Sequence, residues 1–344
     1  MMKISAQNLS KICSDKLAEK TSDANAKSRL QQELDYIAKN EVYAEVLAVT
    51  SELVSYSREL GYYSRFMGRM GSSLIAFLLG ITEVDPLKYN LPVEVFMGDR
   101  SWDIEMTFDV NFIPILKQYV QENYPHIPIV DRGELPSWLV FRGDATNWNT
   151  YGFGDGSIVK LSFYGNSYGY PALKELTELT GVDIYSIPFN DKQTIEILKT
   201  VGMEVDDKES DESELWRSSI MQMVNPKTFE ELVQTEGWIR GDYSCEKKDI
   251  PNMPAFRDEI FLYLLHRGID KETAYDIMER VGRGGFGLSE RDTPEYISAI
   301  LNAGIPKQYI NNLNQVWRLG LKAHCIGTTM AKYHAAWFKA HYPE

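Results

Sequence analysis

The sequence predicts an α/β domain followed by an all-α domain. Up to about residue 190, short segments with strand-like alternation are mixed with helical segments; beyond residue 214 only helical periodicity is found. Between the two lies a strongly acidic stretch, Glu204–Glu214, with seven acids and one lysine. Mixed strands and helices followed by helices alone are typical of an α/β domain joined to a helical one.

The N-terminal part is predicted to be helical from Asn25 to Tyr62, because apolar residues recur every three or four positions. A loop with Gly68 and Gly71 follows. A second, apolar helix is expected over Leu74–Gly80, with Ser72 as its N-cap.

Residues 102–108 have the alternation of a strand. Three apolar side chains share one face and three polar ones the other. The apolar set is Ile104, Met106 and Phe108, and the polar set is Asp103, Glu105 and Thr107. A helix is then expected over 109–124, followed by strands at 127–130, 138–141 and 158–163 and a helix over 171–180. The second half is expected to form helices at 227–235, 256–266, 271–281, 293–303 and 307–316, and from about residue 327 onward.

Composition argues for a soluble chain in a reducing compartment. The longest apolar run, Leu74–Ile81, is too short to cross a bilayer, and the N-terminus has no apolar signal region. Three widely spaced cysteines, Cys13, Cys245 and Cys325, contain no CxxC pair. We therefore expect a cytoplasmic protein without disulfides, structural zinc or membrane contact.

The net charge of −13 alone disfavours nucleic acid, whose phosphates are bound by cations. The distribution of charge weakens this objection, because the C-terminal region from residue 302 is basic. It has one acid, Glu344, and five basic residues: Lys307, Arg318, Lys322, Lys332 and Lys339. Local potential decides what binds to such a surface.

Residues 29–90 contain the glycine–serine loop GRMGSS, and residues 159–192 contain VKLSFYG. A third stretch has two parts, 257–281 and 321–343, and its second part carries KAH and FKAHYP. Together these three stretches resemble the C-family replicative polymerases of bacteria, the α subunit of DNA polymerase III in its PolC form, and they follow the order that the family has. VKLSFYG is similar to the family's KLDxLG strand, and the third stretch is the most specific.

The resemblance implies a nucleotidyltransferase-like palm with a mixed sheet, followed by all-α fingers. It places N-terminal helices leading into the palm in residues 1–60 and the palm in 61–190. It places an acidic linker in 191–214 and the fingers in 215–344.

The strand over 102–108 falls on the family's catalytic carboxylate motif. Asp103 stands where the first aspartate belongs, Glu105 replaces the second and Thr107 the third. Two divalent ions in such a site call for oxygen ligands, so Asp103 and Glu105 are the candidate catalytic and Mg²⁺-binding residues. They could equally be the solvent face of an edge strand.

The third catalytic carboxylate of the family corresponds to Ser162. A hydroxyl carries no negative charge and is a poorer Mg²⁺ ligand than a carboxylate. The interval between Asp103 and Ser162 is also shorter than in the family, which implies that the thumb is missing. Both departures predict weak or absent DNA synthesis.

The glycine–serine loop lies beside the incoming triphosphate in the family. Gly68, Gly71 and Ser72 keep the pattern, while Met67 and Arg69 depart from it. Arg69, or the helix N-terminus after Ser72, could hold a phosphate. The glycines could also persist only because the backbone turns there.

In the fingers, Lys322 and His324 match KAH, with Arg318 one turn upstream. The resemblance implies that this region faces the nucleotide phosphates and the template. His324 could instead be a packed helix residue, and Lys322 a solvated one.

These observations favour a PolC-like protein reduced to palm and fingers. The candidate ligands are DNA (as template–primer or single strand), dNTP and a replication partner. The protein could be a phage or mobile-element derivative or half of a split assembly. One alternative is an active, Mg²⁺-dependent polymerase that uses Asp103 and Glu105 with a third ligand such as Asp109 or Asp155. Another is a purely structural interaction protein.

Overall fold

The computed structural model describes residues 6–98, 103–133, 136–143, 159–167, 169–200, 211–285 and 294–343. The chain divides into two compact units, of which the first runs to Tyr185 and the second begins at Ser186. No helix within these described ranges is both long and apolar enough to cross a membrane.

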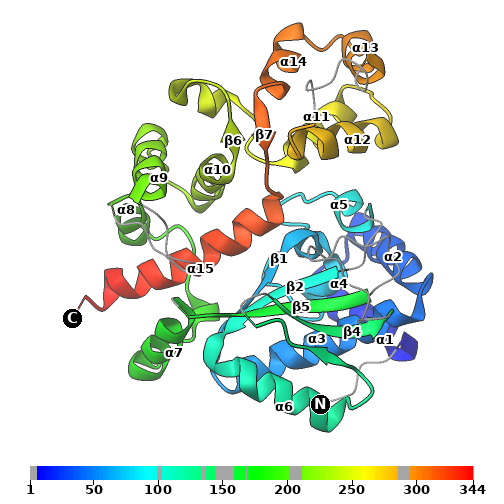
Figure 1. Ribbon diagram of the computed structural model, residues 1–344, viewed down its shortest axis with the longest axis vertical. Helices are drawn as coiled ribbons and strands as arrows, with labels where there is room; N and C mark the ends of the chain where they lie inside the picture. Colours follow the sequence, from blue (N-terminus) through cyan, green and yellow to red (C-terminus); the bar gives the residue numbers. More distant parts are fainter. Residues whose placement is uncertain are drawn as a thin grey trace. The chain divides into compact units, whose positions relative to one another are not determined.

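The first unit combines a sheet with helices (Figure 1). Its elements are α1 (Ala6–Lys20), α2 (Ala24–Ala38), α3 (Glu41–Glu59), β1 (Ser64–Met67), η1 (Gly68–Ser72), α4 (Leu74–Leu78), α5 (Val93–Met97), β2 (Asp103–Asp109), η2 (Val110–Phe112), α6 (Ile113–Asn123), β3 (Ile129–Val130), β4 (Ser137–Arg142), β5 (Val159–Asn166) and α7 (Gly169–Thr180).

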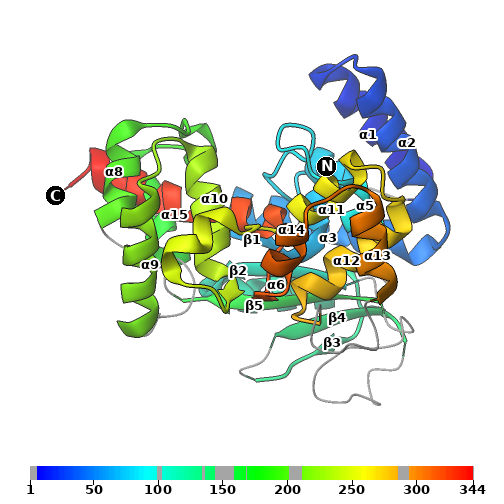
Figure 2. The same cartoon turned by 90° about the horizontal axis from the view of Figure 1, so that it is seen from above.

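The five strands form one mixed sheet in the order β1-β2-β5-β4-β3. The central strands β2 and β5 are parallel, and all other neighbouring pairs are antiparallel. Figure 2 shows β4 and β3 at one edge of this sheet. The mixed sheet that the sequence predicts is thereby confirmed, together with its strands at 102–108, 127–130, 138–141 and 158–163, each within a few residues.

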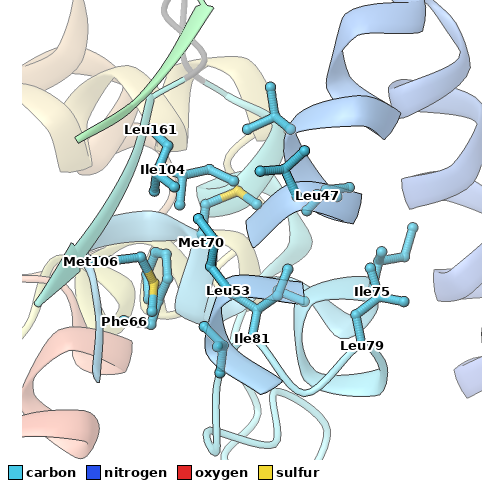
Figure 3. Close-up of a cluster of buried hydrophobic side chains, with 14 of the residues drawn as sticks. Leu47, Leu53, Phe66, Met70, Ile75, Leu79, Ile81, Ile104, Met106 and Leu161 are labelled. Atoms are coloured by element: carbon cyan, nitrogen blue, oxygen red, sulfur yellow. The ribbon is translucent and has the colours of Figure 1, made fainter. Parts of the chain in front are cut away.

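One face of the sheet packs against α3. Leu47 and Leu53 of this helix lie close to Ile104 and Leu161 of the two central strands (Figure 3). Ile104, like Met106 and Phe108, is fully buried, so the predicted apolar face of β2 is correct. Burying each such side chain stabilises the fold by about 1.5–3 kcal/mol. The opposite face therefore carries the polar residues of β2.

The helix after the glycine–serine loop is capped by Ser73, and the prediction of Ser72 was wrong. The Ser73 hydroxyl accepts a hydrogen bond from the Ala76 amide at 3.1 Å, and its backbone is extended, as an N-cap requires. Ser72 ends the preceding 3₁₀ turn with a fully buried side chain. The turn shifts the helix start by one residue, which the sequence pattern alone does not reveal.

The second unit is mainly helical. Its elements are α8 (Lys192–Thr200), α9 (Asp211–Val224), α10 (Phe229–Arg240), β6 (Asp242–Tyr243), η4 (Lys247–Asn252), α11 (Arg257–His266), α12 (Lys271–Gly282), α13 (Pro294–Asn302), α14 (Lys307–Leu313), β7 (Val316–Arg318) and α15 (Lys322–His341), and η3 (Ile184–Ser186) joins the two units.

The prediction of an all-α second domain was wrong in one respect. The strands β6 and β7 form an antiparallel ribbon in which Asp242 pairs with Arg318 and Tyr243 with Val316. Strands this short show no alternation, and their pairing joins residues more than seventy positions apart, so tertiary contacts override the helical pattern of 307–316. Residues 192–200, within the segment that we assigned to a linker, form α8.

His334 lies in the interior of the second unit, on α15, where its ring stacks on Phe189 with centroids 5.8 Å apart. Burial lowers the pKa of His334 from 6.5 to about 4. The imidazole of His334 binds a proton at a higher pH in the unfolded chain than in the folded one. The neutral, buried ring therefore makes its full contribution to stability above pH 6.5, and this contribution is lost as the pH falls toward 4.

We expect acidification from pH 7.5 to pH 5 to lower the free energy of unfolding by about 2 kcal/mol because of His334. Urea unfolding at the two pH values measures this. The non-titrating His334→Met variant should lose correspondingly less on acidification, whereas His266→Gln, at an exposed position, should behave like the wild type. An equal pH dependence in His334→Met and the wild type would contradict the assignment.

Candidate active site

The polar face of the sheet brings several predicted site residues into one row. In the strand register, Glu105 of β2 pairs with Met67 of β1 and with Ser162 of β5, and Ser162 pairs with Trp138 of β4. Cross-strand partners point to the same face of a sheet. Glu105 and Ser162 are therefore neighbours, as the resemblance predicts for the second and last catalytic positions.

The glycine–serine loop also reaches this row. Gly68 has a positive φ of 77°, and a β carbon added to it would lie 3.7 Å from Glu105 Oε2. A left-handed backbone explains the glycine at this position. Gly68 and Glu105, far apart in sequence, thus lie side by side, while Arg69 is partly exposed and Gly71 is buried in the same 3₁₀ turn.

Met67, on the edge strand β1, lies beside Glu105 on this face and has polar neighbours. The Thr107 hydroxyl lies 2.9 Å from the Met67 sulfur, and the Tyr164 hydroxyl also contacts it. Both hydroxyls donate to the thioether, a weak acceptor. Thr107, at the third position of the carboxylate motif, is therefore fully buried, and its hydroxyl is hydrogen-bonded to the Met67 sulfur.

Cationic side chains cover another part of the same face. Lys160 Nζ lies 4.4 Å from the centre of the Trp138 ring, and the Arg132 guanidinium lies 3.9 Å from it. These are cation–π contacts with a buried indole. Lys160, itself buried, is the register partner of Asp103, which begins β2 and whose side chain lies outside the described residues.

The described donors on this face do not fit a pair of Mg²⁺ ions. Two such ions need several hard oxygen ligands, mostly carboxylates. Glu105 supplies one carboxylate and Ser162 a buried hydroxyl, while Met67 supplies a soft sulfur and Lys160 a positive charge. Nowhere in the described ranges do three His, Cys, Asp or Glu side chains come close enough to hold a metal.

Asp109 is poorly placed to complete such a site. It lies four residues along β2 from Glu105, which in an extended strand is about 13 Å. Asp109 is buried and accepts a hydrogen bond from the Asn111 amide at 2.8 Å, as the cap of η2. The other suggested ligand, Asp155, lies outside the described residues.

The helix N-terminus after the glycine–serine loop is already occupied by a carboxylate. Glu33 of α2, fully buried, accepts hydrogen bonds from the Leu74 and Ile75 amides at 2.9 and 3.0 Å and from the Ser73 hydroxyl at 2.8 Å. These amides are the donors that would otherwise bind a phosphate. Our suggestion that this helix start holds a phosphate is therefore not supported by its geometry.

Arg29 completes this arrangement. Its Nε lies 3.1 Å from Glu33 Oε1, and its guanidinium also donates to the carbonyls of Ser72 and Leu91. The pair fixes the loop that carries Gly68 and Arg69. Sequence reasoning missed Glu33, although a signal existed: an acid at position 33 interrupts the apolar stripe of Leu30, Leu34 and Ile37.

The predicted residues of the second unit lie around the start of α15. Asp258 of α11, which is buried, accepts a hydrogen bond from the Lys322 amide at 2.9 Å and so fixes the first turn. Arg318, exposed on β7, forms an ion pair with Asp242 at 2.9 Å. His324 Nε2 lies 3.5 Å from Arg240 Nη1. Lys322 is partly exposed, so its side chain has access to solvent.

A buried ionic network lies behind these residues. Glu236 of α10 forms ion pairs with Arg240 at 2.7 Å, Lys332 at 3.0 Å and Arg217 at 3.0 Å. Burial alone would raise the pKa of Glu236, but Lys332, Arg217 and Arg240 together hold it well below the ordinary value. This network links α9, α10 and α15 and positions His324 through Arg240.

Comparison with known proteins shows what the first unit is similar to. Residues 5–129 match the family model described as the bacterial DNA polymerase III alpha NTPase domain. That segment includes the glycine–serine loop and β2 but ends before β4 and β5.

Comparison over the whole chain identifies individual similar proteins. The chain is 24% identical to PolC-type DNA polymerase III of Caldanaerobacter subterraneus and of Thermotoga maritima, and 23% identical to that of Streptococcus mutans, each over 92% of its length. It spans about a third of the length of these relatives. The resemblance to PolC that the sequence predicts is confirmed, at low identity.

Proposed function

We propose that this protein is a reduced homologue of PolC-type DNA polymerase III that binds DNA and synthesises it weakly or not at all. In this proposal the first unit is the palm and the second the fingers. The observation that carries it is the pairing of Glu105 with Ser162, where a metal site needs a second carboxylate.

Two further observations support a reduced palm. Met67, which pairs with Glu105, accepts hydrogen bonds from the hydroxyls of Thr107 and Tyr164, so a sulfur lies beside the candidate carboxylate. In addition, the alignment with the Caldanaerobacter relative extends over 447 positions, more than the 344 residues of this chain. The relative therefore contains a large number of residues without a counterpart, consistent with a missing thumb.

Primer extension tests the loss of synthesis. We expect no extension of a primed template with dNTPs and Mg²⁺ or Mn²⁺ beyond the level of an Asp103→Ala control. Clear extension that Asp103→Ala abolishes would contradict the proposal and establish the alternative, an active polymerase that uses Asp103 and Glu105.

DNA binding tests the remaining function. We expect a fluorescently labelled primer–template to bind with an affinity that decreases steeply with salt, because counterions are released from phosphates. Lys322→Ala should weaken binding several-fold at low salt. It should also reduce the slope of log affinity against log salt concentration by about one.

Lys339→Ala is the matched control, since Lys339 is exposed on the same helix but three turns or more from the KAH segment. It should leave the affinity nearly unchanged. Equal losses in both variants would indicate a general charge effect. Absence of binding at every salt concentration would favour a purely structural interaction protein.

A further inference from the structure

A pocket of about 300 Å³ lies within the second unit, and its lining residues are distinct from the site residues discussed so far. It is lined by residues of α10, α11 and α14, which Figure 1 labels, and by the segment 251–254. Its volume is at the lower end of ligand-binding pockets and suits a single side chain better than a nucleotide.

Aromatic rings form much of the pocket wall. Trp238 donates its indole N–H to the Met253 carbonyl at 2.9 Å, which fixes the ring. Tyr263 and Tyr309 pack against each other with centroids 4.5 Å apart and an interplanar angle of 32°. Burial, together with Tyr263 and Glu259, raises the pKa of Tyr309, so its hydroxyl stays neutral. Such rings attract cations through their electron-rich faces.

Glu259 is the charged residue of the lining. Its carboxylate accepts hydrogen bonds from the Gln234 side chain at 2.8 Å and the Ala255 amide at 2.7 Å. Both donors are neutral, and no Lys or Arg within the described parts of the chain forms an ion pair with Glu259. A fixed carboxylate beside aromatic rings favours a cation and repels phosphate.

We propose that this pocket binds the ammonium or guanidinium group of a lysine or arginine side chain on a partner protein. The carboxylate supplies charge, the rings supply cation–π contacts, and the amides of Asn252 and Asn312 supply polar groups at the wall. The net charge of −13 favours the approach of a basic partner. This assignment does not depend on DNA binding.

The full chain labelled with ¹⁵N-tryptophan would be titrated with three pentapeptides that differ only in a central lysine, arginine or norleucine. The Trp238 indole signal, assigned with a Trp238→Phe variant, reports on the pocket. We expect the lysine or arginine peptide to shift this signal and the norleucine peptide, similar in shape but neutral, to bind at least about tenfold more weakly.

Glu259→Gln keeps the shape and should weaken binding about tenfold, whereas Glu272→Gln, exposed on α12, should not. Should Glu259→Gln fail to fold, Tyr309→Leu provides a second variant with the same expectation. No shift at millimolar peptide, or equal binding of the norleucine peptide, would overturn the proposal. Tighter binding of putrescine or dAMP than of the peptides would overturn the assignment to a protein side chain.

Discussion

Replacing Glu236 by alanine is expected to destabilise the second unit by about 3–5 kcal/mol, enough to unfold a marginally stable domain. The variant leaves Lys332 and Arg217 buried without the carboxylate that both contact. Desolvated cations without a counter-charge are among the most costly groups in a protein interior. Thermal unfolding followed by circular dichroism measures the loss.

The matched control is Glu230→Ala, an exposed acid on the same helix, which should change stability by less than about 0.5 kcal/mol. Adding Lys332→Met to Glu236→Ala should recover part of the stability, because it removes one of the buried charges left without a partner. If the double variant were less stable than Glu236→Ala alone, the charge argument would fail.

The network also predicts an acid dependence. The pKa of Glu236 is held well below its ordinary value of 4.5 in the folded state. A carboxylate of this kind contributes stability that is full above the unfolded pKa and is lost as the pH falls through the folded one. Below pH 4.5 we therefore expect the Glu236 contribution to decline, in addition to the earlier effect of His334.

Glu33→Ala is expected to destabilise the first unit by a comparable amount, about 3–5 kcal/mol. The variant removes the acceptor of the Leu74 and Ile75 amides and leaves Arg29 without its carboxylate partner. A buried helix start without a partner is unfavourable, because each orphaned donor loses its hydration without replacement.

This prediction separates folding from ligand binding. Glu33→Ala should lower the denaturation midpoint and increase proteolysis within residues 64–98, which includes the glycine–serine loop. Glu19→Ala, exposed on α1, should do neither. Unchanged stability of Glu33→Ala would mean that this helix start is free to accept another anion and would restore the phosphate-site hypothesis.

Part of the candidate site could be predicted from the sequence. Alternation along 103–108 places Ile104 and Glu105 on opposite faces of the strand, and the structure has Ile104 buried and Glu105 exposed. The match of VKLSFYG to a catalytic strand places Ser162 beside Glu105, and the register confirms that they are neighbours. Local pattern was sufficient for the two faces of β2, because strand geometry decides which residues of one strand share a face, whereas the place of Ser162 came from the resemblance.

The partners of the buried charges could not be predicted. The position of Glu33 in the apolar stripe of α2 indicates that it is buried, but Ser73, which it contacts, lies forty residues later at the start of α4. Glu236 and Lys332 are 96 residues apart. No periodic pattern shows either pairing, since each depends on how whole helices pack and not on local propensity.

The sequence by itself therefore determined the relatives of this protein, the mixed sheet, the face of β2 that bears Glu105, and the absence of a carboxylate at Ser162. Only the tertiary structure showed that Glu33 binds the amides at the start of α4 and that β6 and β7 pair. It also showed that the Met67 sulfur accepts hydrogen bonds from the hydroxyls of Thr107 and Tyr164. The physical reason is the sequence separation of the interacting residues. Periodicity reflects local backbone geometry, whereas buried polar groups form hydrogen bonds with residues that are close only in the folded chain.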